Sequence, residues 1–244
     1  MSGTPTTSRS RGYASPLDGK PVPPSGMLPR LRYYGRRNGY LYALASYVGR
    51  YSHAFWRIFA PAFSRGRIRR WLARPGDKIV NLGGGSNIFD RWLTADVDAR
   101  ADVYVDILHP LPFDDGTLDV IYLEEVIEHV SREQGRSLMA ECVRALKPGG
   151  HLRLTTPDLD AFVASFDGTA DAAGAINDIF YEHGHRYIYS RAGIKGLLTA
   201  VGFVEVRESS FRDAEARFGF FDTHPLRFEV SHAELAQYWE ARKP

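Results

Sequence analysis

Residues 78–87 read KIVNLGGGSN. The first five form a short apolar run of the kind found in strands buried within a parallel sheet. Three consecutive glycines, Gly83, Gly84 and Gly85, then end the run, and they let the backbone turn sharply and approach a ligand that a Cβ would repel. Ligands of open α/β sheets bind outside the carboxyl ends of the strands. The stretch therefore predicts a binding crevice at the end of a strand.

Two acids, Asp96 and Asp98, follow this glycine turn after a second short apolar stretch. A carboxylate at the tip of the neighbouring strand can accept hydrogen bonds from both hydroxyls of a ribose, which indicates a nucleoside site. A dinucleotide fingerprint would need glycine at Ile88 and an acid about twenty residues further on. A P-loop would need a lysine after the glycines. Both fit less well, and a glycine-rich turn without a ligand stays open as the simplest alternative.

The spacing resembles the first motif of the class I S-adenosylmethionine-dependent methyltransferases, E-x-G-x-G-x-G. Asn81, Gly83, Gly85 and Asn87 occupy its four positions, and the two asparagines depart from the pattern. The resemblance runs from residue 78 to the C-terminus and includes predicted bacterial methyltransferases associated with glycan biosynthesis. Further phrases in the order of that group are PLPFDD (110–115), TLDVIYL (117–123), EEVIEHV (124–130), LKPGG (146–150), HGHRYIYS (183–190) and LLTAVGFVEV (197–206).

The resemblance implies an α/β fold, Rossmann-like and doubly wound around a mostly parallel seven-stranded sheet. Strands are expected at 78–82, 94–95, 103–105, 120–123, 152–155 and 203–206, and helices at 134–146, at 159–166 and from Ser190 to Gly202. Only eight residues separate Gly85 from Thr94, so the first crossover helix must shrink to a turn or two at 88–93. Near 237–241 the resemblance implies a final antiparallel strand, which we favour, whereas Ser231 and Glu234 form a capping box typical of a helix.

The same resemblance implies S-adenosylmethionine as the cofactor and a set of residues that bind it. Asp96 is expected to bind the ribose hydroxyls, with Asp98 as its substitute, and Asp106 to face the adenine amino group. A solvated loop carboxylate is the alternative for each acid. The remaining expected cofactor residues are Asn81, Gly83, Gly84, Gly85 and Asn87 around the turn, and Leu123 and Glu124 at the methionine end.

Methyl transfer to a hydroxyl or amine requires aligned donor and acceptor and a group that takes the proton. The acceptor-side candidates are Glu125, Glu128, His129, His183, His185 and Tyr187, and we assign catalysis to His129, His185 and Glu125. His129 follows the fourth strand, and an imidazole has the pKa of a base near neutral pH. A purely structural histidine is the alternative. No metal site is assigned, because His129, His183 and His185 show no recognised ligand spacing.

The charge of the chain is unevenly distributed. Between residues 21 and 76 there is no acid and there are eleven arginines, whereas residues 77–244 carry a net charge of −11. We divide the chain into a disordered tail (1–29), a basic aromatic helical extension (30–75) and a methyltransferase domain (76–244).

The helical extension carries apolar residues at three- and four-residue spacing, which predicts a helix that Pro61 ends or kinks, followed by a short helix at 64–72. The spaced residues are Tyr40, Leu44, Tyr47, Tyr51, Phe55, Ile58 and Phe59. This stripe could pack on the catalytic domain, or the helix could meet an anionic partner such as a membrane surface or RNA. The two roles can coexist, because a helix has two faces.

Cys142 is the single cysteine, so neither an intrachain disulfide nor a cysteine zinc site is possible, and its apolar neighbours predict a core position. The N-terminus lacks the apolar region of a secretory signal, and no stretch has the ~20 apolar residues of a membrane span. We expect a cytoplasmic protein with peripheral membrane contact through the basic aromatic segment.

The favoured function is methyl transfer to a hydroxyl or similar nucleophile of a small-molecule or glycan-type acceptor. An RNA methyltransferase and a non-catalytic binding subunit are the alternatives. Nucleic acid is disfavoured as a partner, because residues 77–244 are anionic and the N/D-P-P-Y/F motif of amino-group methylation is absent. The sequence leaves the oligomeric state open.

Overall fold

The computed structural model describes residues 28–29, 32, 36, 40–41, 44, 53–166, 172–181, 183–213, 215–223 and 235–244. The strands of its sheet are β1 (Ile79–Leu82), β2 (Leu93–Asp96), β3 (Val103–Tyr104), β4 (Leu118–Glu124), β5 (Leu146–Pro157), β6 (Val204–Ser209) and β7 (Ala236–Arg242). The helices are α3 (His53–Leu72), α4 (Arg132–Ala145), α5 (Leu159–Ala164), α6 (Ala172–Tyr181) and α7 (Arg191–Ala200), with 3-10 turns η1 (Ile127–His129) and η2 (Gly219–Phe221).

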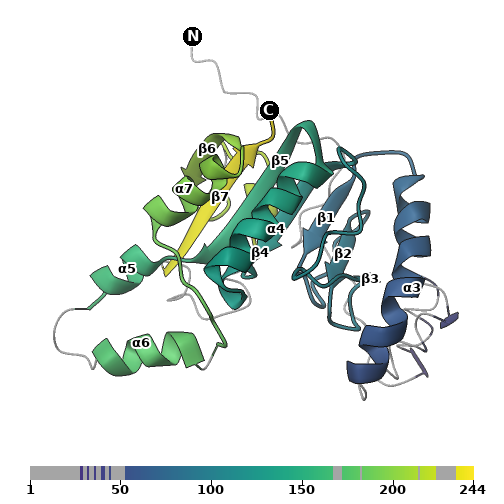
Figure 1. Cartoon of the computed structure of the whole chain (residues 1–244), viewed down its shortest axis with the longest axis horizontal. Coiled ribbons are helices and arrows are strands. Elements are labelled where there is room, and N and C mark those ends of the chain that lie inside the picture. The colour runs from purple at the N-terminus through teal and green to yellow at the C-terminus, as the bar shows by residue number, and fades with distance from the viewer. Residues whose placement is uncertain are drawn as a thin grey trace, which may run out of the picture.

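The strands form one seven-stranded sheet in the order β3-β2-β1-β4-β5-β7-β6 (Figure 1). All neighbours are parallel except β7, which runs antiparallel to both β5 and β6. This confirms the predicted fold, and the strand expected near 237–241 is part of β7. The competing capping box, Ser231 and Glu234, lies outside the described residues.

The direction of sheet growth changes beside β1, which pairs with β2 on one side and β4 on the other. Strands β2 and β3 extend the sheet away from β1, and the chain then returns to add β4 and β5 on the opposite side. In open α/β sheets such a reversal leaves a crevice at the carboxyl ends of the strands, where ligands bind. The glycine turn follows β1 directly, so it lies at this crevice.

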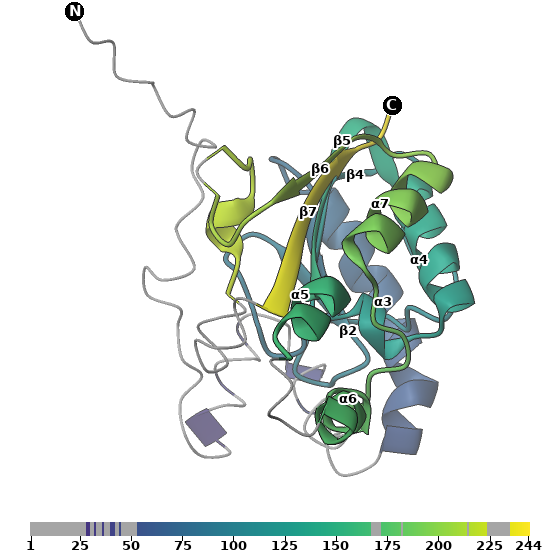
Figure 2. The same ribbon diagram turned by 90° about the vertical axis from the view of Figure 1, so that its left-hand side faces the viewer.

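Successive residues of β1 and β4 face opposite sides of the sheet, as the pleat requires. Val80 and Ile121 enter the main core, whose remaining side chains come largely from α3, α4, α7 and the other strands. Ile79 and Tyr122 enter a second cluster on the other face, with Phe218 and Phe221 from around η2. Figure 2 shows α3, α4 and α7 on one side of the sheet and η2 on the opposite side.

The connection from β1 to β2 contains no helix, so the expected turn or two of helix at 88–93 is wrong. Residues 83–92 form turns, and two of their aromatic side chains, Phe89 and Trp92, are buried. The Trp92 ring centroid lies 4.3 Å from that of Phe221 and 5.6 Å from that of Tyr122. These rings cover the sheet where a longer crossover would have placed a helix.

Two helices on the main-core face begin after a serine cap, and α4 begins at Arg132, two residues before the expected start at 134. Ser131 caps α4 in a reciprocal capping box with Gln134. Ser190 caps α7 by accepting a hydrogen bond from the Gly193 N–H, as predicted. Residues 146–150, expected to close the preceding helix, already belong to β5, and Cys142 is buried within the core as expected.

Helix α3 runs through Pro61 without ending, so the expected division into two helices is wrong. Its buried face carries Trp56, Ala60, Ile68 and Trp71. The Trp56 indole N–H donates to the Val97 carbonyl at 3.1 Å, tying the helix to the loop after β2.

Part of the predicted apolar stripe lies on the other side of this helix. The side chains of Ile58 and Phe59 are exposed, with 70% and 46% of their surface accessible. The packing expected for these two residues is therefore wrong, because Trp56 and Trp71 supply the buried face. Residues 1–27 and most of 30–52 lie outside the described residues, so the proposed disordered tail and the domain boundaries stay predictions.

Candidate active site

The glycine turn is built so that two of its glycines cannot carry a side chain. Gly83 has a φ of +75°, and a Cβ there would lie 2.4 Å from the Val126 Cγ2. A Cβ on Gly84 would lie 2.1 Å from the Asn81 Nδ2. The Gly83 N–H donates to the Ala95 carbonyl at 2.8 Å, which joins the turn to the end of β2. The turn is thus held close to both neighbouring strands.

Asp96, the last residue of β2, points back at this turn. Its Oδ2 accepts a hydrogen bond from the Gly85 N–H at 2.7 Å, and its Oδ1 accepts one from the Asp98 N–H at 2.8 Å. Burial raises the pKa of the Asp96 carboxyl, while the two backbone donors oppose that shift. The predicted approach of the carboxylate to the glycine turn is therefore present, and it fits a ligand that offers two ribose hydroxyls.

The other two predicted acids have different surroundings. The Asp98 carboxylate accepts hydrogen bonds from the Arg100 Nε at 3.0 Å, and its Oδ1 also accepts from the Arg100 N–H. The geometry therefore favours Asp96 over Asp98 as the ribose ligand, as the sequence did. Asp106 follows β3 at the same edge of the sheet, where its carboxylate caps the Leu108 N–H at 3.0 Å.

The two asparagines of the glycine motif fix the shape of the turn. The Asn81 Nδ2 donates to the Asn87 carbonyl at 2.8 Å, and the Asn87 Nδ2 donates to the Thr223 Oγ1 at 3.2 Å. Thr223 in turn donates from its backbone N–H and its hydroxyl to the Glu124 carboxylate, at 2.6 and 2.5 Å. The glycine turn is therefore held by a chain of hydrogen bonds that runs from Asn81 through Asn87 and Thr223 to Glu124. Sequence reasoning missed Thr223.

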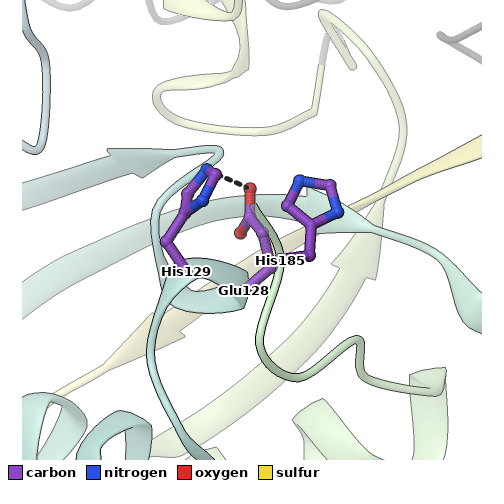
Figure 3. Close-up of side chains that lie close together, drawn as sticks. All are labelled: Glu128, His129 and His185. Carbon is purple, nitrogen blue, oxygen red and sulfur yellow. Dashed lines mark ion pairs between the residues drawn. The ribbon is translucent and has the colours of Figure 1, made fainter. Parts of the chain in front are cut away.

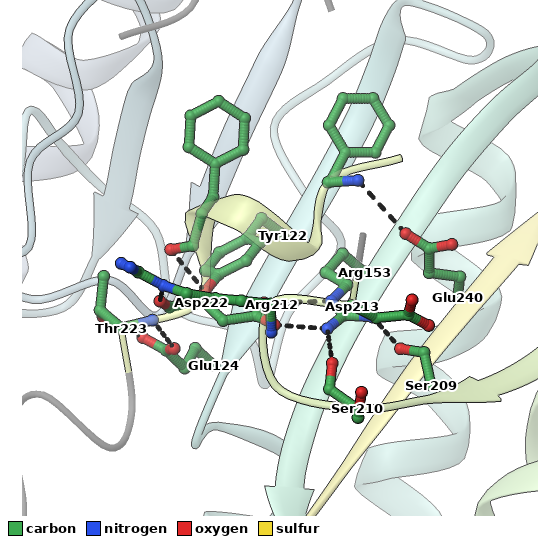
Figure 4. Close-up of polar contacts among 12 residues, drawn as sticks. Tyr122, Glu124, Arg153, Ser209, Ser210, Arg212, Asp213, Asp222, Thr223 and Glu240 are labelled. Atoms are coloured by element: carbon green, nitrogen blue, oxygen red, sulfur yellow. Dashed lines mark hydrogen bonds and ion pairs between the residues drawn. The ribbon is translucent and has the colours of Figure 1, made fainter. Parts of the chain in front are cut away.

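A buried ion pair places Thr223 at the crevice (Figure 4). The Arg153 guanidinium on β5 is fully buried and forms a two-pronged contact with the Asp222 carboxylate, which also accepts from the Arg212 N–H at 3.1 Å. Desolvation raises the pKa of Asp222 to about 6, although Arg153 opposes that shift. An arginine inside the apolar strand LRLTT is the one sequence signal that could have revealed this pair.

Three further side chains, from Glu128, His129 and His185, converge after the end of β4 (Figure 3). Their ligand atoms all lie within 4.8 Å of one another, although His185 is 56 positions from His129 in the chain. Glu128 and His129 belong to η1, and His185 comes from the loop before α7. The backbone N–H groups of Arg186 and Tyr187 donate to the Glu128 carbonyl at 2.7 and 3.1 Å, which fixes this loop on η1.

The three groups differ in exposure. Glu128 is completely buried and His185 is half-buried, whereas 44% of the His129 side chain is exposed. Burial raises the pKa of the Glu128 carboxyl to about 7, and the hydrogen bond from the Thr156 hydroxyl opposes that rise. Burial, together with His129 and His183, lowers the pKa of His185 to about 4, so this imidazole is neutral at pH 7.

The structure thus brings His129 and His185, which the sequence assigned to catalysis, together with Glu128, and the Glu125 side chain hydrogen-bonds to the Glu128 carboxyl. Glu125 begins the turn after β4 with a φ of +58°, and its N–H donates to the Thr155 carbonyl at 3.0 Å. His183 stacks on His185 with ring centroids 5.6 Å apart. Leu123 is fully buried at the end of β4.

Val126 connects the glycine turn to η1. It lies two residues before Glu128, and its methyl groups occupy the space that a Cβ on Gly83 would need. A group bound at the glycine turn would therefore lie near η1, where a carboxylate and two imidazoles can take or hold a proton. This arrangement suits a transfer reaction in which the acceptor loses a proton.

Comparisons with known proteins agree with this geometry. Residues 62–154 match the protein family described as "Methyltransferase domain". A 94-residue stretch is 27% identical to an "Uncharacterized 37.1 kDa protein in transposon TN4556" of Streptomyces fradiae, covering 38% of this chain. The match spans only about a quarter of that protein, 26% of its length.

Solved structures with similar folds include phosphoethanolamine N-methyltransferase 2 of Haemonchus contortus, in complex with phosphomonomethylethanolamine and S-adenosylhomocysteine. Its TM-score is 0.50 at 13% identity, over 88% of this chain and 60% of that one. A SAM-dependent methyltransferase of Archaeoglobus fulgidus has a TM-score of 0.49 at 14% identity, over 73% of this chain and 92% of that one.

The sheet order and the glycine turn facing Asp96 are those expected of a class I S-adenosylmethionine-dependent methyltransferase, and the domain match covers less than half of this chain. Together they support a methyltransferase that uses S-adenosylmethionine as its methyl donor. The matched residues 62–154 include the glycine turn, Asp96, Glu128 and His129 but end before His185.

Proposed function

We propose that this protein transfers the methyl group of S-adenosylmethionine to a hydroxyl or similar nucleophile of a small-molecule or glycan-type acceptor. The observation that carries the proposal is the group formed by Glu128, His129 and His185 at the acceptor side of the crevice. An alcohol is a poor nucleophile while it keeps its proton, so its methylation needs a base within reach. A histidine side chain suits that task near neutral pH, and the Glu128 carboxyl beside it has a pKa of about 7.

On the donor side, Asp96 would accept the ribose hydroxyls, and Gly83 and Gly85 would let the backbone lie against the methionine and ribose portions. The cofactor, when bound, supplies an electrophilic methyl group on a sulfonium. In the transfer the S–CH3 bond breaks, an O–CH3 bond forms and the hydroxyl proton passes to the protein. We assign that proton to His129, the most exposed of the three groups.

The test is to incubate the purified full chain with S-adenosylmethionine labelled in its methyl group and a fractionated cell extract. Label is expected in small molecules or lipid-linked glycan, in a form that resists mild alkali, because ethers survive conditions that hydrolyse methyl esters. The variant His129→Gln should lose at least about 99% of this incorporation, since a positioned base contributes roughly 100-fold or more. Its affinity for S-adenosylhomocysteine should change less than about twofold, within the scatter expected of independent sites.

Two results would overturn the proposal. Label in RNA alone would favour the alternative of an RNA methyltransferase, and a fully active His129→Gln variant would remove the base from the mechanism. A control at His109→Gln, an exposed histidine after β3, should keep both incorporation and affinity.

We also propose that α3 contacts an anionic lipid surface. Ile58, Phe59 and Phe63 expose 70%, 46% and 42% of their surface, and Arg65, Arg69 and Arg70 lie on the same side of the helix. Apolar and aromatic groups beside arginines suit the headgroup region of an anionic membrane. None of the described helices is long and apolar enough to cross a membrane.

Sedimentation with vesicles tests this contact. The chain should sediment with vesicles containing phosphatidylglycerol more than with phosphatidylcholine alone, and Arg65→Glu with Arg69→Glu should abolish the difference. Arg136→Glu, an exposed arginine on α4, is the matched control and should have little effect. Equal binding to both vesicle types, or salt-sensitive RNA binding without sedimentation, would refute a lipid partner.

A further inference from the structure

The group Glu128, His129 and His185 has the composition of a metal site as well as that of a base. Two imidazoles and one carboxylate are the ligands found in catalytic zinc sites and in facial-triad iron sites. The nearest atoms of the three side chains lie within 4.8 Å of one another. Ligand atoms around a tetrahedral zinc ion lie about 3.4 Å apart for bond lengths near 2.1 Å. Side-chain movements of about an ångström would therefore close the site.

A second observation comes from Glu128. This carboxylate is completely buried, and its Oε2 accepts a hydrogen bond from the Thr156 hydroxyl at 2.9 Å. Its Oε1 has no well-aligned donor among the described residues and faces the His129 Nε2 at 3.8 Å, while the Glu125 side chain also hydrogen-bonds to the Glu128 carboxyl. A buried carboxylate oxygen without a well-aligned donor is costly, so such an oxygen calls for an explanation. A cation between Glu128 and the two imidazoles would satisfy it.

The orientation of His129 suits a ligand. Its Nδ1 lies 3.4 Å from the Gly184 carbonyl, which can only accept, so this contact places the proton on Nδ1. The unprotonated Nε2 is then directed at the Glu128 carboxylate. Metal-binding histidines commonly donate their other ring N–H to a carbonyl in this way, which fixes the tautomer and the ring. The two imidazoles flank the Glu128 carboxylate (Figure 3).

We propose that Glu128, His129 and His185 bind one divalent first-row transition-metal ion of the zinc type. Three protein ligands leave a fourth position open, as in catalytic rather than structural sites. The exposed side of His129 gives that position access to solvent and to an acceptor. His183, which the sequence had grouped with His129 and His185, packs against the site as a neighbour and is not a ligand.

The role of the ion rests on the proposed function, whereas its binding does not. An acceptor hydroxyl bound at the open position would lose its proton more easily, because a coordinated oxygen has a lower pKa. The three ligands would then hold the resulting alkoxide beside the glycine turn. Because His129 is one of these ligands, the ion would replace it in removing the proton, which would leave to solvent. The acceptor would thus be a hydroxyl compound, with a second oxygen donor favouring chelation.

The test uses the tag-free full chain, stripped with a chelator and titrated with Co²⁺, whose visible absorption reports coordination number. One equivalent should bind and give the strong bands of a four- or five-coordinate ion, and Zn²⁺ should displace it. His185→Asn should weaken Co²⁺ binding by more than about 100-fold, since even the loss of a second-shell partner costs 10- to 100-fold. Glu128→Gln should do the same.

Matched controls separate a ligand from a folding effect. His183→Asn changes the histidine that stacks on His185 and should keep one equivalent of Co²⁺ with the same spectrum. Every variant is checked for S-adenosylhomocysteine affinity and for its circular dichroism. Because Glu128 is buried and its variant could unfold, the half-buried His185 is the decisive position.

The outcomes are separable. Failure of the stripped chain to take up stoichiometric Co²⁺, or equal loss in His183→Asn and His185→Asn, overturns the metal site. Metal binding with full methyl transfer in the stripped protein refutes the assigned role and leaves the proposed function intact. Stoichiometric binding without label in any extract fraction contradicts the proposed function and leaves the metal site standing.

Discussion

The donor and acceptor halves of the crevice are built in different ways. The donor half comes from one continuous stretch, in which the glycine turn and Asp96 contact each other across eleven positions. Its carboxylate oxygens both accept backbone hydrogen bonds. The acceptor half brings together Glu128 and His185, which are 57 positions apart, and leaves the Glu128 Oε1 without a well-aligned donor among the described residues.

This difference determines how much the geometry of each half depends on distant parts of the chain. A local site is shaped by backbone geometry and needs only glycines and one acid, so a short motif carries it. A site assembled across the chain depends on where a late loop docks, here through the Glu128 carbonyl and the N–H groups of Arg186 and Tyr187. The donor half therefore specifies a class of cofactor, while the acceptor half can change with its loops.

The largest expected effect is a loss of stability caused by changing the backbone of the glycine turn in the donor half. Gly83→Ala should lower the free energy of unfolding by about 3–5 kcal/mol, the sum of left-handed strain and overpacking against Val126. Urea denaturation measures this loss. Gly149 has the same φ of +75° with nothing within 4 Å of its Cβ position, so Gly149→Ala should cost only about 1–2 kcal/mol.

A double variant sharpens this test. Adding Val126→Ala to Gly83→Ala should recover part of the loss, giving a coupling energy of about 1 kcal/mol or more. Equal costs at Gly83 and Gly149 would show that Val126 moves aside freely and that the turn is looser than its geometry indicates.

The next effect separates the two acids of the donor half. Asp96→Asn should weaken S-adenosylhomocysteine binding by roughly 10- to 150-fold, which corresponds to the 1.5–3 kcal/mol of a hydrogen bond to a charged group. Calorimetric titration measures it. Asp98→Asn should cost less than about threefold, because the Asp98 carboxylate already binds Arg100. A reversed order would assign the ribose to Asp98.

A smaller effect tests the link between the crevice and the C-terminal segment. Thr223→Val removes the hydroxyl bridge between Asn87 and Glu124 and should lower the free energy of unfolding by about 1–2 kcal/mol. Thr199→Val, at an exposed threonine of α7, should change it by less than about 0.5 kcal/mol. Thermal or urea unfolding distinguishes them, and equal small effects would mean that the bridge contributes little.

The smallest effect is a pH dependence of the donor half. The carboxylate form of Asp96 accepts the ribose hydroxyls, and burial raises its pKa above 3.8. Affinity for S-adenosylhomocysteine should be constant near neutral pH and fall as the pH drops through this raised pKa, by up to about tenfold per unit. Calorimetry from pH 7 downward measures it. Asp96→Asn should give a flat profile over the same range, and a fall of equal size in that variant would point to another group.

The residues of the sequence alone indicated the parallel strands β1 to β5, the glycine turn and its meeting with Asp96. Apolar runs, glycines and a strand-end acid are local signals, and the parallel order that aligns the strand ends follows from the crossovers. The final strand β7 needed the family resemblance, because the capping box of Ser231 and Glu234 pointed to a helix.

Only the tertiary structure decided the other features. Packing of the Phe89 and Trp92 rings takes the place of the first crossover helix. Helix α3 buries Trp56 and Trp71 rather than Ile58 and Phe59. The ion pair between Arg153 and Asp222 places Thr223 beside the glycine turn. The tertiary structure also brought Glu128 close to His129 and His185. Each of these features depends on contacts between residues that are distant in the chain. Periodicity and spacing reflect only residues that are close together in the chain.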